Sequence, residues 1–141
     1  MKNAFATCLV AHTVAAGVAA QSQDAPPKEL APLQGTWNVT LMNGNAPQQQ
    51  ISLTITGAKY AETVEGNVVE TGTIKVDNAK TPATIDLLIV EGDSAGQTQL
   101  GIIEVKSDVI RCLLAAPGGG TRPTSFDKGD GELFVTMQKK K

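Results

Sequence analysis

Carboxyl groups are the side chains of this sequence that could carry out acid–base chemistry. They are spread along the middle of the chain at Glu62, Glu65, Glu70, Asp86, Glu91 and Glu104. Two carboxyl groups that face each other about 5–10 Å apart can hydrolyse a glycosidic bond. Asp86 and Glu104 lie in segments expected to be neighbouring strands, so they could come close. The sequence leaves their direction open, and such residues usually occupy the solvated face of a sheet, so we expect no catalytic residue.

The cysteines and the histidine restrict the chemistry further. Cys8 and His12 lie in an N-terminal segment that we expect to be removed, which leaves Cys112 and no histidine in the mature chain. An intrachain disulfide, a Cys/His zinc site and a Ser-His-Asp or Cys-His nucleophile are then excluded on residue counts alone.

Cys112 lies in the aliphatic segment Val109–Leu114. In a strand it would share a face with Ile110 and Leu114, opposite Arg111. A reactive thiolate needs a cationic and partly exposed setting, whereas a cysteine among aliphatic side chains usually behaves as a small apolar residue. We therefore predict a buried structural thiol.

Three short segments resemble ion-binding or phosphate-binding loops only superficially. Asp93–Gly96 and Asp127–Gly131 lack the ligand spacing of an EF-hand and are typical of turns. Pro117–Gly120 lacks the Lys-Ser/Thr signature and the following helix of a phosphate loop. The sequence therefore predicts no metal and no cofactor.

The N-terminal residues 1–20 have the layout of a secretory signal peptide. Lys2 is followed by an alanine-rich apolar run, and Val18–Ala20 supplies small residues before a polar segment. A membrane anchor is the alternative, but a spanning helix needs roughly 20 strongly apolar residues, and His12 interrupts this shorter run. We expect cleavage after Ala20, export to the periplasm or the extracellular space, and no stable membrane insertion afterwards.

The remaining length suits one domain. Residues 21–32 are rich in Pro, Ala and Gln and predict a polar linker. Where the linker meets the domain, Leu30, Leu33 and Gln34 can form a short helical turn that caps the domain. The domain itself is expected over residues 33–141. The formal net charge of the chain is −2, and loss of Lys2 makes it slightly more negative, which gives no electrostatic reason to bind nucleic acid. We expect Lys139–Lys141 to be a solvated tail.

From Gly35 onward the apolar residues recur with a period of two, which indicates half-buried strands. Trp37, Val39 and Leu41 alternate with polar residues, and so do Ile51, Leu53 and Ile55. Further strands are expected near Lys59–Val64, Val68–Val76, Ala83–Glu91, Gln97–Val105, Asp108–Ala115 and Glu132–Gln138, with a short extra strand over Thr121–Phe126. Short turns separate them.

About eight strands with short connections predict an all-β, antiparallel, up-and-down barrel, which has no free edges. Gly72 and Gly101 inside strand patterns indicate bulges or bends. Leu87–Val90 and Gly101–Ile103 are apolar on both faces. We interpret both segments as covered on the outside by a loop or terminus; the alternative is an exposed patch for a partner.

Leu33–Trp37, with its Gly-Thr-Trp start, and the later blocks Ala83–Leu87, Leu100–Glu104 and Arg122–Phe126 follow one another in a specific order. In these blocks the chain resembles a family of uncharacterised bacterial lipocalin-like domains that is numerous in planctomycetes. The resemblance implies a lipocalin-like barrel and an export signal, and no established activity. Ile103 departs from the family, which places an aromatic residue there.

The resemblance also implies a structural role for Trp37. In lipocalin-like barrels the matching tryptophan packs at the closed end, often beneath an arginine from late in the chain. Arg122 is our predicted partner and Arg111 the second choice. The alternative is that Trp37 is a plain core residue and Arg122 lies in a surface loop.

The function best supported by these patterns is non-enzymatic binding of a small hydrophobic molecule inside the barrel. An eight-stranded barrel can be packed solid or hold one small ligand. The residues expected to line its lumen are Ile51, Leu53, Ile55, Tyr60, Ile85, Leu87, Ile102 and Val135. The alternative is a solid barrel that serves as a structural or protein-interaction module of the cell envelope.

Overall fold

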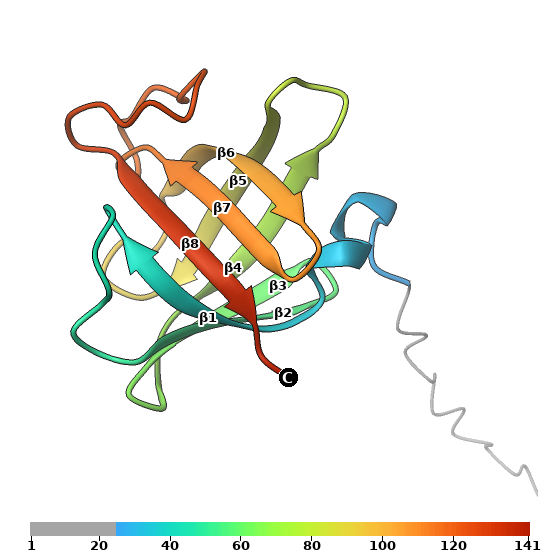
Figure 1. Cartoon of the computed structure of the whole chain (residues 1–141), viewed down its shortest axis with the longest axis vertical. Coiled ribbons are helices and arrows are strands. Elements are labelled where there is room, and N and C mark those ends of the chain that lie inside the picture. Colours follow the sequence, from blue (N-terminus) through green and yellow to red (C-terminus); the bar gives the residue numbers. More distant parts are fainter. Residues whose placement is uncertain (1–24) are drawn as a thin grey trace, which may run out of the picture.

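Eight strands form one closed antiparallel barrel in the computed structural model, which describes residues 25–141 (Figure 1). The strands are β1 (Gly35–Met42), β2 (Ile51–Thr56), β3 (Lys59–Val64), β4 (Asn67–Asp77), β5 (Ala83–Glu91), β6 (Thr98–Lys106), β7 (Val109–Leu114) and β8 (Leu133–Lys139). Each strand pairs with the next in the chain, and β8 pairs with β1. The predicted up-and-down barrel is confirmed. The predicted signal peptide, with Cys8 and His12, lies outside the described residues.

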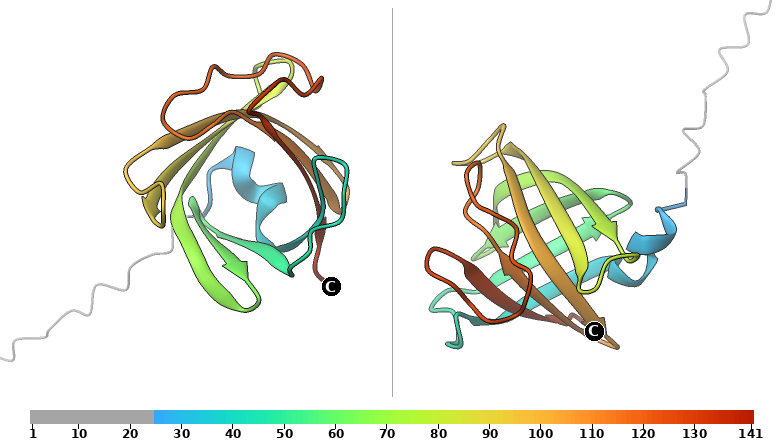
Figure 2. Two further views of the ribbon diagram at one scale, coloured as in Figure 1. Left: turned by 90° about the vertical axis from the view of Figure 1, so that its left-hand side faces the viewer. Right: turned by 90° about the horizontal axis from the view of Figure 1, so that it is seen from above.

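One end of the barrel is closed by a short 3-10 helix, η1 (Lys28–Leu33), which overlaps the end of the segment predicted as a linker. Figure 2 (left) looks along the barrel and shows η1 across it. Leu30 and Leu33 are buried against the core. The Gln34 side chain donates to the carbonyl oxygens of Leu30 and Gly57 at 3.0 and 2.9 Å, and its own oxygen accepts from the Gly57 amide at 2.7 Å. Gln34 therefore ties η1 to the β2–β3 turn.

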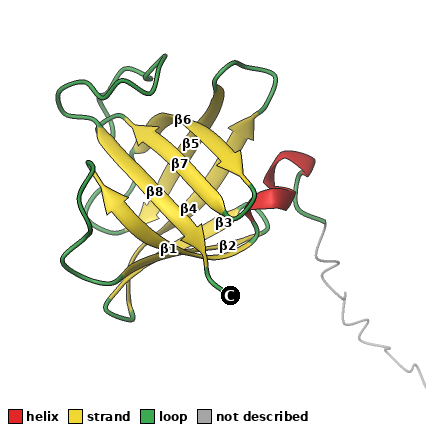
Figure 3. Ribbon diagram, in the orientation of Figure 1, coloured by secondary structure: helices red, strands yellow, loops and turns green. Residues whose placement is uncertain are grey.

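The longest connection, residues 115–132, runs over the outer surface of the barrel and contains no strand (Figures 2 and 3). The extra strand predicted over Thr121–Phe126 is therefore wrong. Side-chain contacts, rather than strand pairing, attach this connection to the barrel. The Arg122 guanidinium donates to the carbonyl oxygens of Ile85 and Gly101 at 3.1 and 2.8 Å and to the Asp86 carboxylate at 2.5 Å.

A second contact fixes the same connection to β7 and β8. Phe126 packs edge-on against Phe134 with ring centroids 6.1 Å apart, and the Arg111 guanidinium lies 5.1 and 5.2 Å from the two centroids. Beneath this cover Ile102 and Leu113, a cross-strand pair, are 1% and 0% exposed. The interpretation that a loop covers the Gly101–Ile103 segment is confirmed.

The outer face of β4 and β5 has no such cover. Val68 and Val90 are 62% and 55% exposed, and Val69 and Leu88 are also exposed. The interpretation that Leu87–Val90 is covered on its outer face is therefore wrong, because the long connection reaches β5 at Ile85 and Asp86 and leaves Leu88 and Val90 in solvent.

Two irregularities in β4 shape the barrel. Pairing with β3 shifts register beside Val69, so that Glu62 lies opposite Glu70 and Thr63 lies opposite Val68. Pairing with β5 shifts between Thr71 and Gly72. The bulge predicted at Gly72 is confirmed, and β-bulges of this kind bend a strand and increase its twist.

Candidate functional site: the barrel cavity

The barrel is not packed solid but contains a cavity of about 400 Å³. Leu33 of η1 forms part of its wall at the closed end. At the opposite end the wall includes Ala116 and Gly131, which are exposed to solvent. The cavity is therefore reached from the end where the long connection leaves β7 and returns to β8.

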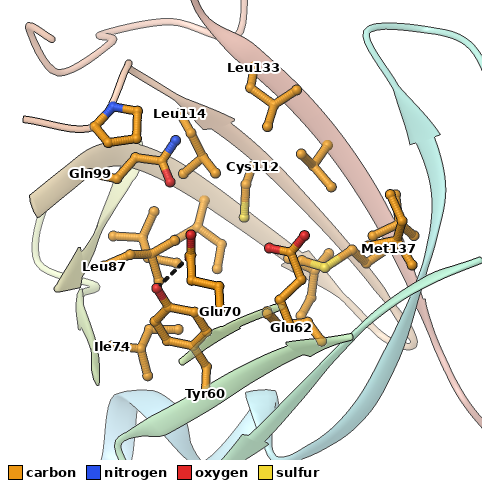
Figure 4. Close-up of a pocket in the computed structure, with 18 of the residues that line it drawn as sticks. Tyr60, Glu62, Glu70, Ile74, Leu87, Gln99, Cys112, Leu114, Leu133 and Met137 are labelled. Atoms are coloured by element: carbon orange, nitrogen blue, oxygen red, sulfur yellow. Dashed lines mark hydrogen bonds between the residues drawn. The ribbon is translucent and has the colours of Figure 1, made fainter. Parts of the chain in front are cut away.

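Most of the wall is aliphatic, as alternation along the strands predicts (Figure 4). Seven of the eight residues expected in the lumen line the cavity: Ile51, Leu53, Ile55, Tyr60, Ile85, Leu87 and Val135. Ile102 does not, and its placement was wrong. Its neighbour Ile103 lines the cavity in its place.

The misplacement of Ile102 has a physical cause. Along β6 the inward positions are Gln99, Gly101 and Ile103, because Gln99 pairs with Leu87 and Gly101 with Ile85, both of which face inward. The long connection also buries the outer face of β6, so this strand carries apolar residues on both of its faces. Ile103 is thus a cavity position.

A polar group interrupts the apolar wall on β3 and β4. Tyr60, Glu62 and Glu70 all line the cavity, and Figure 4 shows the three side chains pointing into it. The Tyr60 hydroxyl donates to Glu70 Oε1 at 2.8 Å. Glu62 lies directly across from Glu70 in the ladder, and within residues 25–141 it has no side-chain hydrogen bond or ion pair.

Burial dominates the protonation of this group. Loss of solvent is the main cause that raises the pKa of Glu62, and the charge of Glu70 adds to it. Burial, together with the hydrogen bond to Glu70, raises the pKa of Tyr60 far above its usual range. Tyr60 therefore remains a neutral donor, and the acidic groups of the cavity are the two carboxyl groups.

The lining residues drawn from the described part of the chain include no lysine or arginine. The ion pairs lie on the outer surface, where Arg122 pairs with Asp86 and Glu104 pairs with Lys106 at 3.0 Å and with Arg111 at 3.6 Å. The Lys106 partner is the main cause that lowers the pKa of Glu104.

Asp86 and Glu104, the carboxyl pair considered from the sequence, do not form a pair. Asp86 lies opposite Leu100 in the ladder, whereas Glu104 lies opposite Arg111. Neither side chain lines the cavity. The two carboxyl groups that the fold does bring together are those of Glu62 and Glu70.

Trp37 is fully buried at the closed end, but its cationic neighbour is not an arginine. The indole N–H donates to the Leu33 carbonyl oxygen at 2.7 Å. Lys139 lies over the ring, with its ammonium nitrogen 5.6 Å from the centroid. The predicted Trp37–Arg122 pair is wrong, because Arg122 is held at β5 and β6. Lys139 is also the last residue of β8 and not part of a solvated tail.

Cys112 lies on β7 with Ile110 and Leu114 in the core, opposite Arg111, as alternation predicts. It points into the cavity (Figure 4) and is 3% exposed. Burial raises the pKa of Cys112 to about 12.

We expect Cys112 to react slowly in the folded protein, because the thiolate is the reactive form and burial suppresses it. Iodoacetamide at mildly alkaline pH should alkylate the folded protein about a hundredfold or more slowly than the urea-unfolded protein, as followed by intact mass. Equal rates in the two states would contradict the buried-thiol assignment.

Sequence reasoning missed Glu62, Glu70 and Gln99 as cavity residues. A signal was present, because Glu62 has the parity of Tyr60 along β3 and Glu70 has that of Ile74 along β4. Acidic residues were expected on the solvated face because carboxyl groups in a sheet usually point to water, whereas the alternation of their apolar neighbours indicates that Glu62 and Glu70 point inward.

No family model, curated protein or solved structure matches this chain. In the described residues, moreover, no helix has the length and apolar character needed to cross a membrane.

Proposed function

We propose that this protein is an exported, non-enzymatic carrier that binds one small hydrophobic molecule inside its barrel. The observation that supports it is the cavity of about 400 Å³ with mainly aliphatic walls. Ligand pockets typically enclose roughly 300–1,000 Å³, with apolar walls and a few polar groups that orient the ligand. The leader-like residues 1–20 support a role outside the cytoplasm.

The alternative of a solid structural barrel expects close packing at the axis. Protein interiors normally leave few voids larger than a water molecule. A continuous void bounded by side chains from β1 to β8 is therefore better explained by carriage of a ligand than by a purely structural core.

The direct test is binding of an apolar fluorophore, N-phenylnaphthylamine, to protein purified after expression of the full chain. We expect saturable emission enhancement with one dye per barrel. Cys112→Phe, which adds a ring inside the cavity, should abolish binding, whereas Val90→Phe on the exposed face should not change it. Native mass spectrometry of the wild type should also show a co-purified small molecule.

Two results would count against the proposal. One is absence of saturable dye binding by a folded wild type, as judged by circular dichroism. The other is equal dye binding by folded Cys112→Phe and wild type, which would place the dye elsewhere.

A further inference from the structure

We infer that the ligand of the barrel is a cationic amphiphile, an apolar molecule that carries a protonated amine held by Glu62 and Glu70. This inference rests on the proposed carrier function and adds the chemical class of its ligand. It is drawn from the polar group on β3 and β4, in which an apolar ligand alone would leave the Glu62 side chain without a partner.

The first step is the geometry of the two carboxyl groups. Glu62 and Glu70 are a direct cross-strand pair, and both line the cavity. Directly opposed residues on the same face have Cβ atoms about 4.5–5.5 Å apart. One ammonium group with several N–H donors can therefore reach both carboxylates from within the cavity.

The second step is the charge balance. The titratable groups that line the cavity are Tyr60, Glu62, Glu70 and Cys112, and none of them is a base that carries positive charge. Apart from Cys112 and the neutral Gln99, the lining side chains from the other strands are apolar, and Gln99 donates to the Ala115 carbonyl oxygen at 3.0 Å. Like charges at short range in a poorly solvated site are costly unless a cation or a proton joins them.

The third step is the difference between the two carboxyl groups in their hydrogen bonding. Glu70 is held in place by the Tyr60 hydroxyl, while the Glu62 carboxyl group, which has no hydrogen-bond partner among the described residues, is free to bind a ligand. The aliphatic side chains on β7 and β8 across the barrel, such as Leu114 and Val135, would contact the apolar body of the ligand. This separation of an acidic wall from an apolar wall fits an amine at one end of a hydrocarbon.

The test is displacement of the bound fluorophore by three probes of equal chain length: octylamine, octanol and octanoate. We expect octylamine to bind about tenfold or more tightly than octanol, since hydrogen bonds to charged groups are the stronger ones. Octanoate should bind more weakly than octanol. Raising the pH through the elevated pKa of Glu62 should strengthen octylamine binding, because the carboxyl group loses its proton while the amine keeps its own.

Isosteric variants assign the effect to the cavity. Glu62→Gln should lower octylamine affinity about tenfold or more, reduce its pH dependence and leave octanol binding nearly unchanged. Glu70→Gln, which keeps an acceptor for Tyr60, should act in the same direction. Glu29→Gln, an equal change of charge on exposed η1, should have no effect.

Failure of the inference and failure of the carrier function give different results. If the fluorophore binds but octanol competes as well as octylamine, the two carboxyl groups share a proton and the cationic ligand class is wrong. If the fluorophore does not bind to the folded protein at all, the carrier function itself is wrong.

Discussion

Trp37→Ala is expected to lower the free energy of unfolding by about 3–5 kcal/mol, the usual cost of removing a large aromatic side chain from a core. The side chain is fully buried, packs at the closed end of the barrel and holds η1 through the Leu33 carbonyl. Since small domains are stable by only about 5–15 kcal/mol, this is a large fraction of the total. Urea unfolding followed by circular dichroism measures it.

Two further variants separate the contributions at the same place. Trp37→Phe keeps a ring but leaves the buried Leu33 carbonyl without its donor, which should cost about 1–3 kcal/mol. Lys139→Ala removes only the cation over the ring, and because Lys139 is exposed the loss should be about 0.5–1 kcal/mol. If Lys139→Ala were the most damaging of the three, packing and the hydrogen bond would not be what holds this end closed.

Gly72→Ala is expected to cost about 3 kcal/mol, at the upper end of the range for inserting a methyl group into a packed site. A Cβ atom there would collide with the Leu88 carbonyl oxygen and would lie 2.7 Å from Tyr60 Cε1. The carbonyl belongs to the neighbouring strand, so it cannot rotate away as the end of a flexible side chain could. Tyr60 lies directly opposite Gly72, and its displacement should also weaken fluorophore binding.

Gly119→Ala is the matched control for Gly72→Ala. Position 119 lies in the long outer connection, where an added Cβ would meet nothing within 4 Å. Such a change should be neutral or stabilise by up to about 1 kcal/mol, through the unfolded chain. Equal losses for the two variants would mean that the close approach of β4 and β5 at Gly72 is not the cause.

Several features of the fold could be predicted because they depend on local alternation. Side-chain direction along an extended strand changes at every residue, so the inward faces of β2 and β7 follow from their apolar residues. In β1 this holds only up to Val39, because a register shift after it leaves Leu41 exposed and places Met42 in the cavity wall. Ile51, Leu53 and Cys112 were placed correctly for this reason. Alternation was uninformative in β6, where both faces are apolar, and Ile102 was therefore assigned to the wrong side.

Long-range side-chain partners could not be predicted from alternation. Arg122 was assigned to Trp37 by resemblance, yet it binds the carbonyl oxygens of Ile85 and Gly101. A cation is directed by whichever acceptors the folded chain brings within reach, and these lie far away in sequence.

The amino-acid sequence by itself predicted a closed all-β barrel with an apolar interior, because a period of two repeated through eight short strands gives each strand one apolar face, and closing the sheet buries these faces and leaves no free edge. The tertiary structure decided that the interior is hollow and acidic on one side. Without the extra residue at Val69, the tight turn after β3 would pair Glu62 with residue 69. The register shift there places Glu70 opposite Glu62 instead, and pairing across strands depends on such shifts rather than on parity within one strand.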